Sequence, residues 1–528
     1  MARRLCLALC CVVLGATIRA NADDLRARVE AWVAAHEQPI FVELVDLLSL
    51  PNIASDAAGI RRNAERLVAM LSRRGLRSEI LETAGNPLVY GERRVPGAKH
   101  TVLFYAHYDG QPVDAALWKQ ASPFRPVVRA GRMEDGAREV TQPQAAARLD
   151  PEWRVYARSA SDDKAPIVAL CAALDALALG ARQLQRPLLP SSGRANADVP
   201  AEGRAPASNI RVVLDGEEEA GSRSLEGAIS RYREKLSADV LLILDGPLHP
   251  SGRPTLNFGA RGVATLELTV YGPKGALHSG HYGNWVPNPA FALARLLASM
   301  KDDDGRVKVA GFYDGVAPLS SEERRIQEAV PDDLEGLKKL FGIARTEKVG
   351  GSLQEALQYP TLNVRGLRSA YVGADARTVI PSEATAALDL RLVRETPSGA
   401  LVDKVLAHIR AQGFHVVETE PDDATRLRYP KIVRVQRARA TEAYRTPMDV
   451  PESKWVAGVL ERVWGEPPVR LRTSGGTVPI SPFIRALGVP AISVPIVNFD
   501  NHQHSENENL RLGHLWRGIV TFAALLAY

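Results

Sequence analysis

The chain has 528 residues, of which 45% are hydrophobic and 24% are charged. This length exceeds one ordinary hydrophobic core, so we expect two domains of normal globular composition. The net charge of +5 comes from 66 basic and 61 acidic residues without a long basic tract, which argues against a nucleic-acid partner.

The N-terminus has the pattern of an export signal. Arg3 and Arg4 precede an apolar stretch from Leu5 to Ile18, and the segment from Ala20 to Ala22 has the small residues of a cleavage site. We therefore expect residues 1–22 to be a signal peptide. The mature protein would then be periplasmic or secreted, without a stable membrane span. A retained membrane anchor is the alternative.

Cysteine usage fits the same expectation. Removal of the signal takes away Cys6, Cys10 and Cys11 and leaves Cys171 alone. An intrachain disulfide is then impossible, which excludes a small disulfide-stapled scaffold. Cys171 lies in the apolar run from Ala165 to Leu179, so we expect a buried small side chain rather than a nucleophile.

Apolar spacing predicts an α/β fold for the first half of the chain. Two segments have the periodicity of helices, Asp24 to Leu48 and Ala58 to Arg74. Three short apolar runs predict strands: Thr101–Ala106, Ile210–Leu214 and Val240–Leu244. Strands separated by helices indicate a mostly parallel sheet flanked by helices on both faces. Each run ends in a polar cluster, and sites gather at the carboxyl ends of strands in such sheets.

A second pattern begins near Arg261 and predicts an inserted α+β domain. It alternates strands and helices: Val263–Tyr271, Pro287–Met300, Ala384–Val393 and Ser398–Gln412. The first pattern returns at about Tyr444. We therefore expect a catalytic domain in two parts, 23–258 and 437–528, interrupted by a domain at 259–436. Two further segments, Ser122–Asp150 and Gln183–Ser208, have the composition of surface loops.

Three polar clusters offer groups for metal chemistry. His107 and Asp109 alternate at a strand end, so both can face one pocket as ligand and orienting carboxylate. Asp162 precedes a helix, where a carboxylate can bridge two metals or simply cap the helix. The adjacent carboxylates from Glu217 to Glu219 repel one another and are tolerated near positive charge.

The glutamates suggest how such a centre would work, because one can bind metal while its neighbour takes a proton. Asp245 ends the third apolar run, and His504 supplies a late imidazole. Two histidines and several carboxylates form a mixed nitrogen and oxygen set that suits zinc.

Six ordered motifs resemble the metallopeptidase family of carnosinases, bacterial dipeptidases, glutamate carboxypeptidases, acylases and succinyl-diaminopimelate desuccinylase. They are FYAHYDGQPVD, SDDKAP, GEEEAGS, LDG followed by FGARG, HSGHYGN, and SGGTVP with HQHSENE. The resemblance extends from about Val42 to the C-terminus. It implies a zinc exopeptidase-like fold with an inserted lid and dimerisation domain, a homodimer, and two zinc ions per chain, with cobalt or manganese as possible substitutes.

The resemblance also implies a role for each matched residue. His107 and Asp245 would bind one metal, Glu219 and His504 the other, and Asp162 both, with a cis bond between Asp162 and Asp163. Glu218 would be the general base and acid, and Asp109 would orient His107. The implied substrate-binding residues are His278 from a partner subunit, Thr378, Arg391, Gly476 and Thr477. The motif wording selects His504 over His502 and His278 over His281.

Two departures from the family pattern concern glycines. Residues 157–159 read Ala-Arg-Ser where the family has Gly-Arg-Gly, and Ala165 replaces the glycine after the lysine. Each lost glycine restricts the backbone.

Asp245 favours dipeptides or short peptides, because acylases and glutamate carboxypeptidases of the family tend to have Glu there. An N-acyl amino acid amidohydrolase is the first alternative, because the same site could serve it. A non-catalytic peptide-binding homologue is the second, against which the presence of Glu218 and all five ligands argues.

Overall fold

The computed structural model describes residues 2–183, 206–438 and 440–528, so most of the proline-rich segment expected as a loop lies outside the described residues. The chain divides into two compact units. The major unit comprises Met1–Phe258, Thr446–Arg470 and Pro482–Tyr528. The inserted unit comprises Gly259–Arg445 and Leu471–Ser481.

The main sheet of the major unit has eight strands among the described residues, in the order β1-β2-β6-β3-β7-β19-β8-β18. In chain order these are β1 (Arg77–Leu81), β2 (Leu88–Arg93), β3 (Thr101–His107), β6 (Asn209–Asp215), β7 (Val240–Ile243), β8 (Thr255–Asn257), β18 (Val469–Leu471) and β19 (Ala491–Ser493). The central strands β6, β3, β7 and β19 are parallel, whereas β2 and β8 run antiparallel to their neighbours β6 and β19. The three predicted apolar strands are β3, β6 and β7.

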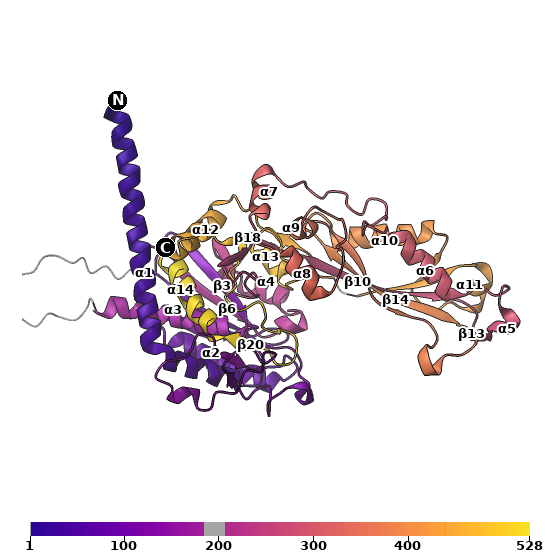
Figure 1. Ribbon diagram of the computed structural model, residues 1–528, viewed down its shortest axis with the longest axis horizontal. Helices are drawn as coiled ribbons and strands as arrows, with labels where there is room; N and C mark the ends of the chain where they lie inside the picture. The colour runs from indigo at the N-terminus through magenta and orange to yellow at the C-terminus, as the bar shows by residue number, and fades with distance from the viewer. Residues whose placement is uncertain (1, 184–205, 439) are drawn as a thin grey trace, which may run out of the picture. The chain divides into compact units, whose positions relative to one another are not determined.

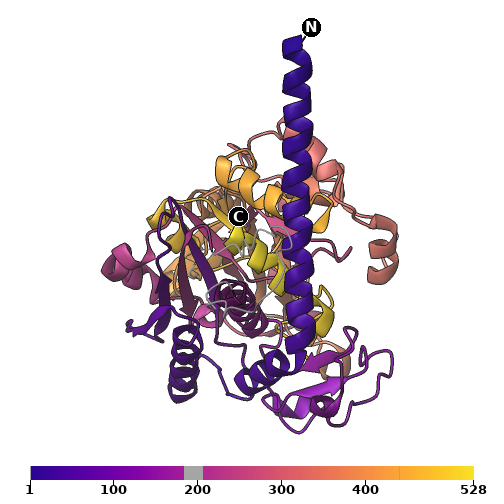
Figure 2. The same cartoon turned by 90° about the vertical axis from the view of Figure 1, so that its left-hand side faces the viewer.

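Helices cover this sheet, as the continuous apolar strands require. Successive residues of β3 and β7 are buried although they point to opposite faces, so both faces are covered. The helices are α1 (Ala2–Leu48), α2 (Ala57–Ser72), α3 (Lys164–Gln183), α4 (Leu225–Leu236), α12 (Pro451–Trp464), α13 (Ser481–Leu487) and α14 (Leu512–Ala527). Helices α1, α3 and α14 contact one another, with α1 in indigo and α14 in yellow in Figures 1 and 2. Within the described residues, no helix combines the length and apolar character needed to span a bilayer.

The segment from Ser122 to Asp150, expected to be a surface loop, contains a strand. β4 (Val127–Arg129) pairs antiparallel with β5 (Arg154–Tyr156), which also pairs with β20 (Asn509–Arg511). Three residues are too few to show a period in the sequence, so the backbone pairing with β5 defines this strand.

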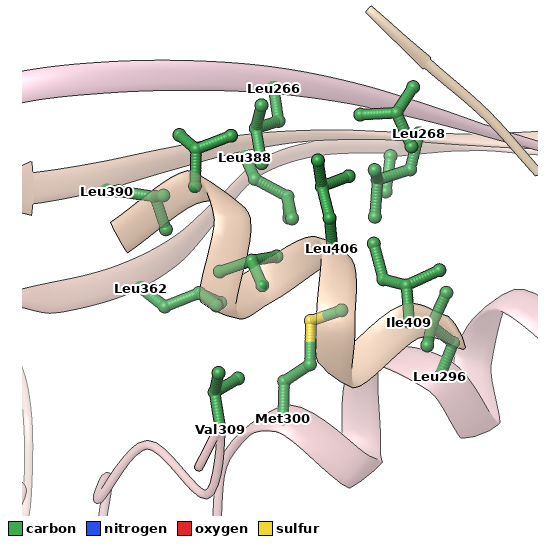
Figure 3. Packing of buried hydrophobic residues seen from close by; sticks show 14 of the residues in the cluster. Leu266, Leu268, Leu296, Met300, Val309, Leu362, Leu388, Leu390, Leu406 and Ile409 are labelled. Atoms are coloured by element: carbon green, nitrogen blue, oxygen red, sulfur yellow. The ribbon is translucent and has the colours of Figure 1, made fainter. Parts of the chain in front are cut away.

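The inserted unit contains a five-stranded sheet in the order β12-β14-β10-β16-β15, counted within the described residues. Its strands are β10 (Gly262–Tyr271), β12 (Thr361–Arg368), β14 (Glu383–Leu392), β15 (His415–Val417) and β16 (Ile432–Arg437). The apolar side chains of β10 and β14 pack against α6 (Pro289–Met300) and α10 (Ser398–Ala411), as Figure 3 shows for Leu266, Leu388 and Leu406. Helix α6 begins two residues after the predicted start at Pro287, because the Asn288 side chain caps it by accepting a hydrogen bond from Ala290 N and Pro289 fixes the first turn.

The smaller elements of the inserted unit complete its outline. They are β9 (Gly259–Ala260), β11 (Leu277–His278), β13 (Val379–Ile380), β17 (Tyr444–Arg445), α5 (Ser279–Tyr282), α7 (Ser321–Glu328), α8 (Leu334–Phe341), α9 (Leu353–Ala356) and α11 (Asp423–Arg428).

The predicted boundary at residue 437 is wrong. Residues 437–445 and 471–481 belong to the inserted unit, not to the major one. The reason is backbone pairing, because β17 pairs with β9, and Ser474 N donates to Gly259 O at 2.8 Å. Gly259 permits this close packing, since a Cβ there would lie 2.6 Å from Tyr444 O.

Candidate metal centre

His107 lies at the carboxyl end of β3 with a carboxylate on each side of its ring. The ring is buried, with Nε2 2.9 Å from Asp162 Oδ1 and Nδ1 3.4 Å from Asp109 Oδ1. Its backbone N donates to Asp163 Oδ2 at 3.2 Å. A carboxylate at Nδ1 fixes the ring orientation and leaves Nε2 directed at the site, as in metal-binding histidines.

Asp109 also fixes the turn that follows β6. Its two carboxylate oxygens accept hydrogen bonds from the backbone N of Glu218 at 3.1 Å and of Glu219 at 3.0 Å. These two glutamates begin a short 3-10 turn, Glu218–Ala220, that has no other side-chain cap. One fully buried carboxylate therefore positions the predicted base, a predicted ligand and the ring of His107.

Asp162 lies between the two predicted histidine ligands. Its Oδ1 is 2.9 Å from His107 Nε2, and its Oδ2 is 3.1 Å from His504 Nε2. The peptide bond to Asp163 is cis, as the resemblance implies. Burial alone would raise the pKa of Asp162, but the hydrogen bonds from His107 and His504 hold this pKa below its ordinary value.

The five predicted ligands form two groups that share Asp162. The first contains His107, Asp162 and Asp245, and the second contains Asp162, Glu219 and His504. In each group the ligand atoms lie within 4.8 Å of one another. Two imidazoles with bridging and terminal carboxylates form a donor set that suits divalent zinc.

The electrostatics of this cluster show that it needs added positive charge. Burial, followed by the nearby charge of Asp162, raises the pKa of Glu219 to about 7 and the pKa of Asp245 to about 6. Burial also raises the pKa of Glu218 well above its ordinary value, with Asp245 and Glu219 adding to the shift. Close carboxylates of this kind become stable in their charged form beside divalent cations, so the residues fit a pair of metal ions.

Two residues near the centre were not assigned a role from sequence. Gln111 Nε2 donates to Glu219 Oε2 at 2.6 Å, and it follows Asp109 by two positions in the first motif. Glu508 accepts hydrogen bonds from the loop that carries Asp162. The only indication in the sequence was that Gln111 lies in the motif FYAHYDGQPVD and Glu508 in HQHSENE. His502, by contrast, lies 3.4 Å from Glu134 and in neither ligand group, as expected for a non-ligand.

The predicted substrate-binding residues all lie in the inserted unit, where they form two pairs. His278 and Thr378 are exposed neighbours, because β11 pairs with β13 and Ser279 N donates to Thr378 O at 3.0 Å. Arg391 Nη1 donates to Thr477 Oγ1 at 2.9 Å. Gly476 is next to Thr477, and its carbonyl accepts from Arg261 N at 3.1 Å. Substrate binding by these residues stays a prediction.

Comparisons with known proteins agree with this geometry. Residues 258–416 match a family model described as a peptidase dimerisation domain. The chain is 25% identical to the Cys-Gly metallodipeptidase of Candida albicans over 93% of its own length and 95% of that protein. It is 26% identical to the Beta-Ala-His dipeptidase of Mus musculus, covering 83% and 79% of the two chains.

A solved structure gives the same result for the fold. The M20 family metallo-carboxypeptidase from Sulfolobus solfataricus superposes with a TM-score of 0.71 and 28% identity, over 92% of this chain and 98% of that one. The similarity to the Candida albicans protein in sequence, and to the Sulfolobus solfataricus protein in fold, thus covers more than 90% of each chain compared. The chain is therefore a homologue of the M20 metallopeptidases, which confirms the resemblance drawn from its motifs.

Proposed function

We propose that this protein is a metal-dependent exopeptidase that hydrolyses dipeptides or other short peptides. The observation that carries the proposal is the pair of ligand groups joined by Asp162, with Glu218 beside them. Its relatives include proteins named as Cys-Gly and Beta-Ala-His dipeptidases, which supports short peptides as the substrate class.

In the proposed reaction, Glu218 transfers the proton and Asp109 holds Glu218 in position. Bound divalent cations would supply Lewis acidity toward the scissile carbonyl and positive charge for the carboxylate cluster. Glu218 takes the proton from the attacking water and passes it to the leaving amine. Asp109 holds the backbone of Glu218 in place during this exchange. Burial around the cluster limits competing contacts with bulk water.

The substrate terminus is proposed to bind in the inserted unit. The guanidinium of Arg391 donates to Thr477 through Nη1, and its Nε lies 3.4 Å from Asp389 Oδ2. Its side chain is 36% exposed, which leaves room for a further anionic partner. A guanidinium matches the two oxygens of a carboxylate. Recognition of a free C-terminal carboxylate would restrict the enzyme to the end of a peptide.

Two zinc ions per chain are proposed as the native metals, with cobalt or manganese as substitutes. The support is the donor set, one histidine and one carboxylate on each side of a shared aspartate. Such mixed sites accept several divalent metals, so the geometry favours the number of ions more strongly than their identity.

The test is a hydrolysis screen on the full chain, stripped with a chelator and reloaded with zinc. It would include Cys-Gly, β-Ala-His, other dipeptides, their C-terminal amides and N-acyl amino acids. We expect cleavage of free dipeptides, loss of activity on stripping and recovery with zinc. Turnover of N-acyl amino acids alone would support the amidohydrolase alternative, and no turnover of any substrate would contradict the proposal.

A homodimer formed through the inserted unit is also proposed. The match to a peptidase dimerisation domain supports it, as does the exposed apolar surface of the edge strand β12 and helix α6. Leu367 is 63% exposed on β12 and Phe291 is 66% exposed on α6. Apolar side chains at a free sheet edge are usually covered by another chain.

Mixing of two inactive variants would test the dimer and the predicted role of His278 together. His278→Ala and Glu218→Gln chains should each be nearly inactive alone. In a heterodimer, one active site combines an intact Glu218 with an intact His278 from the partner subunit, so part of the activity should return. Heterodimers without recovered activity would mean that His278 does not act across subunits.

Export through the N-terminal signal is proposed from the charged, apolar and small-residue segments within residues 1–22. N-terminal sequencing of protein purified from a native-type host would test it. A mature chain beginning after Ala22 is expected. Recovery of the intact N-terminus from the cytoplasmic fraction would contradict the proposal.

A further inference from the structure

Glu508 is a buried carboxylate that receives five hydrogen bonds from one short loop. Its Oε2 accepts from Arg158 Nη1 at 2.8 Å and from Ser159 N at 2.9 Å. Its Oε1 accepts from Ser161 N at 2.9 Å, Ser161 Oγ at 3.0 Å and Asp162 N at 2.9 Å. The residue is 0% exposed. A carboxylate is stable in such a position only when its oxygens are hydrogen-bonded in this way.

The loop that Glu508 holds is the one that carries the shared aspartate. Ser159 adopts φ +62°, a left-handed conformation that costs a non-glycine residue free energy. The Ser159 N–H donates to Glu508, and the Ser159 Oγ accepts from Asn52 Nδ2 at 3.0 Å. These contacts offset the strain and keep the loop in the shape that directs Asp162 between two histidines.

Arg158 completes the arrangement as the counter-charge. It is 2% exposed, forms the ion pair with Glu508, and lies over the ring of Trp118 at 5.3 Å. The charge of each partner is therefore compensated inside the protein. Removing one partner of a buried pair leaves the other charge uncompensated, which destabilises strongly.

Glu508 also ties this loop to the segment that carries the last predicted ligand. His504 lies four residues earlier, with Nε2 3.1 Å from Asp162 Oδ2. Glu508 O accepts from Ala157 N at 3.1 Å, and the next residues form β20, which pairs with β5. One segment thus contacts the side chain of Asp162 through His504 and its backbone N through Glu508.

We propose that Glu508 is a positioning residue that sets the orientation of Asp162 between the two metal sites, with Arg158 as its obligatory counter-ion. The inference rests on the proposed function, because it takes Asp162 to be a shared metal ligand. Glu508 itself contacts neither metal nor substrate. Loss of its carboxylate should weaken metal binding in addition to destabilising the fold.

Glu508→Gln is the variant that tests this, measured by zinc affinity in competition with a chelator and by thermal unfolding of the metal-free protein. Glutamine would place donor N–H groups against the donors of Arg158 and Ser159. We expect zinc affinity to fall roughly 10- to 100-fold, the usual effect of losing a residue that orients a ligand. The kcat of the zinc-saturated enzyme should fall while KM changes little.

Glu37→Gln is the matched control. Glu37 is a 7% exposed carboxylate of the same unit that accepts from Arg148 and from Leu149 N, in neither ligand group. It should lower the unfolding temperature without changing zinc affinity. If Glu508→Gln does not fold, the double variant Arg158→Gln with Glu508→Gln, which leaves no unpaired buried charge, is measured by the same criterion.

The outcomes separate this inference from the proposed function. Wild-type zinc affinity in folded Glu508→Gln would overturn the positioning role and leave the function intact. Equal losses of zinc affinity in Glu508→Gln and Glu37→Gln would also overturn it, because the effect would then be one of general stability. If the wild-type chain itself binds no zinc, the proposed function fails and this inference fails with it.

Discussion

The candidate metal centre of the major unit and the predicted substrate-binding residues of the inserted unit are built in opposite ways. In the metal centre, His107, Asp109 and Asp162 are 1%, 0% and 5% exposed, and each makes several polar contacts. In the inserted unit, His278 and Thr378 are exposed at the ends of two-residue strands. Val372 in the nearby loop is 85% exposed.

The difference concerns how much of each site is fixed before substrate arrives. The buried carboxylates of Asp109 and Glu508 accept several hydrogen bonds and cannot rearrange without leaving a donor unpaired, so the loops that carry the predicted ligands are preorganised. Side chains at exposed strand ends have few restraints and can change conformation more easily. We infer that catalysis depends on single atoms in the major unit, whereas recognition in the inserted unit is spread over weaker contacts.

The largest effect is expected at Glu218. Glu218→Gln preserves shape but removes the proton acceptor, so kcat should fall by roughly 10²- to 10⁴-fold with metal content unchanged. Kinetics and metal analysis of the purified variant would measure both. Glu217→Gln, a change at the adjacent carboxylate outside both ligand groups, should stay near wild type. Residual activity above about one percent in Glu218→Gln would argue against its role.

The next effect is expected at Asp109. Asparagine has one acceptor oxygen where Asp109 uses two, so the backbone N of Glu218 or Glu219 loses its partner. We expect Asp109→Asn to lower kcat/KM by roughly 10- to 100-fold. Asp239→Asn is the control, because Asp239 accepts from Thr101 N at 2.7 Å at the other end of β3. Equal losses in both variants would show that β3 is merely destabilised.

A smaller effect is expected in the inserted unit at Arg391. Lysine keeps the charge but not the planar fork, so Arg391→Lys should raise KM for free dipeptides and lower kcat/KM about tenfold. The C-terminal amides of the same dipeptides should be affected little, because they lack the carboxylate. A loss of equal size on both substrate series would refute carboxylate recognition by Arg391.

The last effect concerns acid stability, for which no change in turnover is expected. Burial, followed by the charges of Arg511 and Arg517, lowers the pKa of His514 in α14 from 6.5 to about 4. Asp500 opposes the shift. Because the folded pKa lies below the unfolded one, the neutral ring stabilises the fold fully above pH 6.5, and this contribution is lost as the pH falls toward 4.

Urea unfolding of wild type and His514→Gln between pH 7 and pH 4 would test this linkage. A pKa difference of this size corresponds to about 3 kcal/mol, and the wild-type chain should lose up to that amount relative to the variant. A difference in unfolding free energy that does not change with pH would contradict the assignment.

The fold could be predicted where the sequence has strong local patterns. The apolar runs of β3, β6 and β7 and the alternation of β10 and β14 lie where expected, because burial on two faces or one leaves a visible pattern. The strand β4 and the return of residues 471–481 to the inserted unit could not be predicted. Both depend on backbone hydrogen bonds, such as that from Ser474 N to Gly259 O, which no side-chain pattern reports.

The ligands of the candidate site could be predicted because each belongs to a recognisable sequence motif. The structure brings together all five expected ligands, and it separates His502 from them. The part played by Glu508 was missed because it acts on backbone N–H groups of residues far away in the sequence. The wording of the motif identified His504. It gave no indication that Glu508, four residues later, accepts hydrogen bonds from the loop that carries Asp162.

Strand β19 comes near the end of the sequence but lies inside the main sheet, which has a consequence for folding during synthesis. β19 lies inside the main sheet between β7 and β8, although both of these precede it by a long stretch of chain. His504 and Glu508 follow β19. A nascent chain therefore holds an unfinished sheet and lacks His504, one of the five predicted ligands, until the segment that contains β19 and His504 has been synthesised, because such distant pairings form last. A chain truncated before β19 would therefore have neither the complete main sheet nor both ligand groups.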